Sequence, residues 1–72
     1  MTPLEAITEI VNTYVKSGQD ARKLEDHALM IDWKDEASMM DKVATRHFAT
    51  ATHIRLEMKR LAGIDIPWAR RA

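Results

Sequence analysis

Apolar residues recur at alternating spacings of three and four between Met30 and Leu61, and this repeat is the strongest pattern in the chain. In a seven-residue frame, one position holds Met30, Ala37, Ala44, Ala51 and Met58, and the other holds Trp33, Met40, His47, Ile54 and Leu61. We call these ten residues the seam; its single polar member is His47. Such a repeat is typical of a helix that packs lengthwise against another helix, so it predicts an all-α protein.

A short helix is predicted at the N-terminus. Thr2 is suited to cap it, Pro3 fits the first helical position, and Glu5 completes a capping box. Apolar residues follow at helical spacing as far as Gly18, and glycine is common directly after a helix. The pattern therefore predicts a helix over 3–17.

Two interpretations are open for residues 20–62, which contain neither glycine nor proline. In the first, one helix spans the segment with a length of about 65 Å. In the second, the chain turns within 32–38, where Asp32, Asp35 and Ser38 can each cap a new helix of a three-helix bundle. The unbroken phase of the seam favours the long helix. Gly63 is expected to end it, and an extended tail is predicted over 63–72.

The seam also predicts self-association. A helix over 3–17 is too short to cover a seam that spans residues 30–61, so a homodimer or higher oligomer is expected to bury the rest. Residues 1–40 carry four basic and eight acidic side chains, whereas residues 41–72 carry seven basic and three acidic ones. An antiparallel arrangement pairs these opposite balances, and a parallel one stacks like charges.

Composition argues against a catalytic or metal-binding domain. The 72 residues are expected to form one domain, and the lack of cysteine excludes disulfides and Cys-based zinc sites. His53 and Glu57 share a helix face, but a metal site needs three or four ligands. No nucleophile is accompanied by a base and an orienting group. We therefore predict no enzymatic activity and no cofactor. Because no apolar run approaches a membrane span, we also predict a cytoplasmic protein.

The tail has a pattern of its own. Ile64, Ile66 and Trp68 alternate with polar residues ahead of Arg70 and Arg71. In one interpretation the tail caps the core of its own chain or of a dimer mate. In the other it docks on another protein, with Trp68 as the anchor and the arginines as a polar rim. These five residues are the candidate partner-binding site.

The sequence thus predicts a small non-catalytic interaction protein, an adaptor, inhibitor or regulator, which self-associates and binds another macromolecule, most simply a protein. Its size and patterning are similar to those of small regulators encoded by bacteria and their phages. The alternative is a nucleic-acid-associated regulator, because Arg46, Arg55, Lys59 and Arg60 make the C-terminal half basic.

Overall fold

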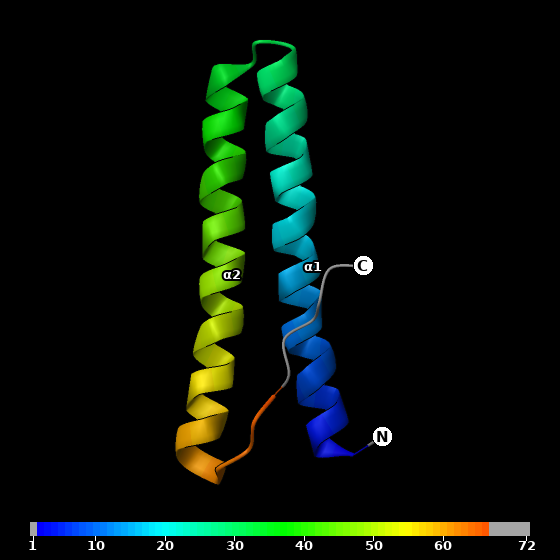
Figure 1. Cartoon of the computed structure of the whole chain (residues 1–72), viewed down its shortest axis with the longest axis vertical. Helices are drawn as coiled ribbons and strands as arrows, with labels where there is room; N and C mark the ends of the chain where they lie inside the picture. The colour runs from blue at the N-terminus through cyan, green and yellow to red at the C-terminus, as the bar shows by residue number, and fades with distance from the viewer. Residues whose placement is uncertain (1, 67–72) are drawn as a thin grey trace.

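The computed structural model describes residues 2–66 and shows two antiparallel helices joined by a short turn (Figure 1). Helix α1 spans Pro3–Met30 and helix α2 spans Lys34–Ala62. Residues 63–66 leave the end of α2 and run back along the hairpin (Figure 1). Residues 2–66 contain no strand, which confirms the all-α prediction for the part of the chain described.

Helix α1 begins where the sequence predicts but ends much later. The hydroxyl of Thr2 accepts a hydrogen bond from the backbone N–H of Glu5 at 3.2 Å, and Pro3 opens the first turn. The predicted end at residue 17 is wrong, because the helix continues through Gly18 to Met30. Gly18 is buried, and a Cβ atom there would lie 2.8 Å from the ring of Phe48. This glycine therefore permits a close contact between the helices instead of ending one.

The chain reverses at Ile31–Trp33 through a Schellman turn. Asp32 adopts a left-handed conformation with φ 61°, and its N–H donates to the carbonyl of Leu29 at 3.2 Å. The N–H of Trp33 donates to the carbonyl of Ala28 at 2.7 Å. The single long helix is therefore wrong. The turn lies at the edge of the predicted 32–38 window and closes a two-helix hairpin, so the three-helix bundle is also wrong.

The turn does not interrupt the heptad repeat of the seam, because most of the seam lies in one helix. Only Met30 and Trp33 precede α2, and the other eight seam residues all belong to that one helix. Asp35 and Ser38 lie inside α2 and do not cap it; the capping position is Trp33, without a side-chain hydrogen bond. Asp35 instead contributes negative charge to the first turn, where the helix dipole favours it.

Helix α2 ends at Gly63 as predicted. Gly63 is left-handed with φ 66°, and its N–H donates to the carbonyl of Lys59 at 2.9 Å. Glycine adopts this conformation without the steric cost that a side chain brings. The residues after it return toward the hairpin, and Ile66 becomes part of the core.

The two helices meet through small side chains. On α2 the buried residues are the three seam alanines, Ala37, Ala44 and Ala51. On α1 the buried residues are Val11, Val15, Gly18, Ala21 and Ala28. Small residues on both surfaces let the helix axes approach closely. The three seam alanines are therefore covered within a single chain.

The core is concentrated at the open end of the hairpin, away from the turn. Its buried cluster consists of Val11, Val15, Ala51 and Ile66. Half-buried side chains pack around it: Ile7, Tyr14, Phe48, Ile54, Met58 and Ile64. Toward the turn the buried residues are only alanines: Ala21, Ala28, Ala37 and Ala44. This half of the hairpin therefore buries little apolar surface and leaves its larger apolar side chains outside.

Candidate interaction surface

An apolar groove of about 200 Å³ lies beside the turn. Its lining residues are Leu24, His27, Ala28, Trp33, Glu36 and Met40. We call it the turn-end groove. The Schellman turn builds it, because the backbone hydrogen bond from Trp33 to Ala28 holds the indole beside the last turns of α1. The backbone of Trp33 is fixed by this hydrogen bond, yet 57% of the residue's surface remains exposed.

The surface around the groove is rich in large apolar side chains. Ten such residues are exposed in the described chain, and six of them lie between residues 24 and 39: Leu24, Leu29, Met30, Ile31, Trp33 and Met39. Single exposed apolar residues are ordinary, but a cluster marks an interaction site. The cluster follows from the thin alanine core, because helices packed this closely leave no room between them for larger side chains.

The second half of the seam forms a row along α2 that α1 covers only in part. We call Trp33, Met40, His47, Ile54 and Leu61 the open row. None of the five is buried: the first and last are exposed, Leu61 by 69%, and the middle three are half-buried. The imidazole of His47 lies 5.9 Å from the ring of Tyr14, centroid to centroid. The single chain thus buries the three seam alanines and leaves the members of the open row exposed or half-buried.

Charge differs sharply between the two ends of α2. Residues 20–41, around the turn, carry seven acidic and three basic side chains, whereas residues 42–66 carry five basic and two acidic ones. Arg22 bridges the helices at the acidic end, with Nη1 2.5 Å from Asp41 Oδ1 and 2.8 Å from Glu25 Oε1. Hydrogen bonds to Asp41 and then Glu25 raise the pKa of Arg22. The turn end is therefore both apolar and acidic.

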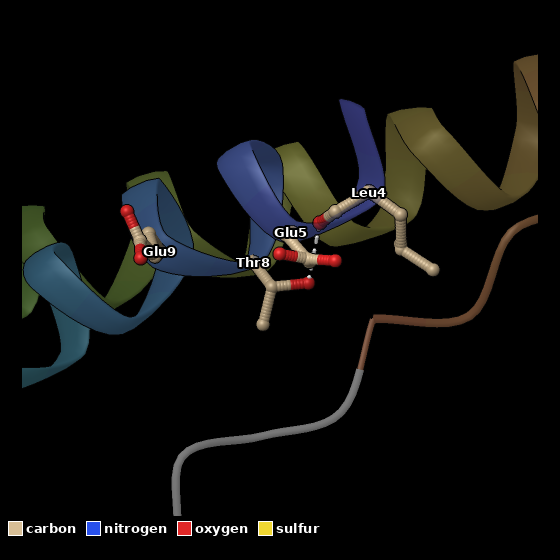
Figure 2. Close-up of a pocket in the computed structure, with 4 residues that line it drawn as sticks. All are labelled: Leu4, Glu5, Thr8 and Glu9. Carbon is tan, nitrogen blue, oxygen red and sulfur yellow. Dashed lines mark hydrogen bonds between the residues drawn. The ribbon is translucent and has the colours of Figure 1, made fainter. Parts of the chain in front are cut away.

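A wider hollow of about 370 Å³ lies on the first turns of α1. Figure 2 shows its lining residues, Leu4, Glu5, Thr8 and Glu9, which all come from one helix. The hydroxyl of Thr8 donates to the carbonyl of Leu4 at 2.7 Å, so it is engaged within the helix (Figure 2). Both glutamates are exposed. The hollow lacks the buried, convergent polar groups that a catalytic site requires.

Part of the tail packs against the core of its own chain. Ile64 and Ile66, two of the five candidate partner-binding residues, pack against the core. Ile66 is only 2% exposed, and Arg55 Nε donates to its carbonyl oxygen at 2.7 Å. These contacts close the open end of the hairpin. The other three candidates, Trp68, Arg70 and Arg71, lie outside the described residues.

Leu24 and Glu36 are parts of this surface that the sequence analysis missed. A signal for Leu24 was present, because Ile10 and Leu24 of α1 and Ile31 of the turn share one seven-residue spacing. All three are exposed in the hairpin. The predicted end of the first helix at residue 17 divided these residues between two elements, so they were not recognised as one surface.

Two other properties bear on the surface. Among residues 2–66, no three His, Asp or Glu side chains come together in a way that could hold a metal ion. No helix in that range is long and apolar enough to cross a membrane.

No family model, curated protein or solved structure matches the chain. Function must therefore be inferred from the surface itself.

Proposed function

We propose that this protein is a small non-catalytic interaction protein, which self-associates through the open row and binds another macromolecule. The division of the seam carries the proposal. Ala37, Ala44 and Ala51 are buried within one chain, whereas no member of the open row is buried. A repeat that a single chain buries only in part is best explained by a second partner for the remaining residues.

The energy available from covering the open row supports self-association. Full burial of a large apolar side chain contributes about 1.5–3 kcal/mol relative to leaving it in water. Trp33 and Leu61 each keep more than half of their surface exposed. A chain of this size has a small core, and association is a common source of the stability that such chains lack.

The exposed apolar residues at the end of α1, beside the turn, suit a second kind of partner. Leu29 and Met30 are exposed at the end of α1, and Met30 is the most exposed large apolar residue described. Their surroundings are acidic, since residues 20–41 hold a balance of −4. A partner that combines apolar side chains with basic ones would match both properties.

The polar side chains support binding over catalysis. The hydroxyls of Thr8, Thr13 and Thr50 each donate to the carbonyl four residues earlier, so all three are engaged by their own helix. Exposed ion pairs join Lys59 to Asp65 and Arg60 to Glu57. Groups bound in this way are poor candidates for an activated nucleophile or its base.

Two measurements test the proposal. The melting temperature of a self-associating chain rises with protein concentration, and that of a monomer does not. Immobilised wild-type protein and Met30→Asp are then compared for capture of cellular partners. Leu56→Asp is the control, because Leu56 is also a large apolar residue with most of its surface exposed, and it lies on α2 away from the turn. We expect Met30→Asp alone to lose a partner. A concentration-independent melting temperature together with identical capture by all three proteins would contradict the proposal.

Nucleic-acid binding is the second candidate, and one observation favours it. Arg46, His53 and Arg60 are exposed at seven-residue spacing along α2, and Lys42 and Lys59 lie nearby in the same helix. A phosphate backbone would bind such a row in a strongly salt-dependent manner. Retention on DNA or RNA that falls steeply with added salt, and that Arg46→Glu abolishes, would favour this function over protein binding.

A further inference from the structure

We propose that two copies of this chain pair through α2 in antiparallel orientation, with His47 of each copy facing His47 of the other. The two open rows then cover each other, and the assembly is a four-helix arrangement of two hairpins. This inference rests on the self-association proposed above and adds to it a surface, an orientation and a register. Four independent properties of the hairpin support it.

The first property is the symmetry of the open row. His47 is its middle member, so antiparallel pairing about this residue places Trp33 opposite Leu61 of the second copy. Met40 is then opposite Ile54 of the second copy. The two most exposed members, at the ends of the row, cover one another, and the half-buried ones meet near the centre.

The second property is the shape at the turn. The Leu61 side chain of the second copy would arrive beside Trp33, where the turn-end groove is lined by Leu24 and Met40. Leu24 of α1 and Ile31 of the turn are exposed on the same part of the molecule and would add to the contact. Apolar side chains would therefore line both sides of the proposed interface, and Leu61 of the second copy would fill a groove that is empty in one chain.

The third property is charge. The first turn of α2 carries Asp35 and Glu36, and its last turn carries Lys59 and Arg60. Antiparallel pairing brings each acidic turn next to a basic turn, whereas parallel pairing stacks acid on acid and base on base. Contact between two turn ends is disfavoured for the same reason, because each holds a balance of −4 over residues 20–41.

The fourth property is surface area. The chain exposes 5536 Å², whereas a compact monomer of its 8.3 kDa mass is expected to expose about 4,600 Å². The excess of about 900 Å² is close to the roughly 800 Å² that each partner buries in a protein interface of ordinary size. The hairpin is elongated, 45 × 22 × 16 Å, so it presents enough surface for an interface of this size along its length.

His47 gives the pairing its register. A single polar residue in an otherwise apolar row is commonly what fixes alignment between paired helices, because any shift would bury it against apolar side chains. At a two-fold axis the two imidazoles can hydrogen-bond to each other, one donating and the other accepting. The other four members of the row are apolar and would tolerate a shift by one heptad.

The chain contains no cysteine, so a single introduced cysteine gives a unique attachment point on the full-length protein. Leu61→Cys carries a spin label, and the label-to-label distance is measured in frozen solution. Positions 33 and 61 are 28 residues apart, so antiparallel pairing about His47 separates the two Leu61 positions by about 42 Å along the helix. Parallel pairing would bring the two labels within about 10 Å, one helix-to-helix spacing.

Cross-linking gives an independent readout. Oxidation of Leu61→Cys alone, or of Trp33→Cys alone, should leave the chains unlinked, and an equal mixture of the two should form a disulfide-linked pair. The control mixture, Leu56→Cys with Trp33→Cys, should not cross-link. Where circular dichroism shows that Trp33→Cys does not fold, the label distance decides alone.

The outcomes separate this inference from the broader proposal. Cross-linking of Leu61→Cys with itself, or a short label distance, would overturn the antiparallel register while leaving self-association intact. A wild-type chain that sediments as a dimer but shows neither cross-link nor the expected distance pairs through another face. A chain that sediments as a monomer would overturn this inference and the proposed self-association together.

Discussion

The ring of Phe48 lies directly against the backbone of Gly18. A Cβ atom built on the glycine would come within 2.8 Å of two ring carbons, Cε1 and Cζ. Cβ atoms do not approach other atoms so closely, so the ring would have to move. The contact joins α1 to α2 where the alanine-lined part of the hairpin gives way to the larger core cluster that Phe48 packs against. Gly18 therefore serves the packing of the two helices.

Gly18→Ala should destabilise the hairpin although alanine is the better helix former. Helix propensity alone would stabilise α1 by about 1 kcal/mol, and overpacking against a ring typically costs about 1–3 kcal/mol. We expect a lower free energy of unfolding in urea for Gly18→Ala. In a Phe48→Ala background the same substitution should raise it, because the ring is gone. An increase in both backgrounds would show that the contact places no demand on position 18.

Asp32 should tolerate glycine better than a branched residue. Its φ of 61° lies in the left-handed region, which costs ordinary L-residues about 1–2 kcal/mol. The ion pair with Lys34 is long, 3.8 Å, and exposed, so its loss should matter little. We expect Asp32→Gly to match or exceed the wild-type stability and Asp32→Val to fall below it. Asp35→Gly, inside α2, is the control and should destabilise; equal effects at positions 32 and 35 would contradict the turn geometry.

Ala44→Glu should unfold the hairpin itself. Ala44 is fully buried between the helices, and a carboxylate there would have no partner. The cost of an unpaired buried charge is about 3–5 kcal/mol, enough to remove most of the stability of a chain this small. Loss of helical circular dichroism reports the effect. Ala49→Glu, at an exposed position on the same helix, is the matched control and should leave the spectrum unchanged.

Ile66→Ala should weaken the open end of the core. The side chain is almost fully buried, and truncation of a buried isoleucine typically costs about 2–5 kcal/mol. Ile64 is only half-buried, so Ile64→Ala should cost less. Chemical denaturation compares the two variants. If Ile66→Ala unfolded at the same denaturant concentration as the wild type, residues 63–66 would not contribute to the fold.

The sequence predicted the features that depend on neighbouring residues. The cap at Thr2, the end of α2 at Gly63 and the helical path of the alanines all follow from spacing or from the chemistry of one residue. Gly18 was misassigned because a glycine that ends a helix and one that admits a ring carry the same local signal. Phe48, which distinguishes the two cases, is 30 residues away.

The turn was harder to predict for a related reason. Asp32 adopts a conformation that glycine usually supplies, and in the sequence it is only one of three possible helix caps, so the pattern did not place the reversal at 31–33. The turn-end groove depends on that reversal, because it brings Leu24 beside Trp33 and Met40. Sequence spacing within one continuous helix would place Leu24 and Met40 far apart. The open row, by contrast, is visible in the sequence, since it needs only the periodicity of α2.

Sedimentation equilibrium tests most directly whether a second copy covers the open row. The three proteins are the wild type, Leu61→Asp in the open row, and Leu56→Asp, whose side chain is 63% exposed and lies outside the seam. We predict a wild-type mass approaching twice the 8.3 kDa of the chain, the same mass for Leu56→Asp, and the single-chain mass for Leu61→Asp. A wild type that remains at 8.3 kDa as concentration rises, or equal dissociation by both variants, would contradict the account.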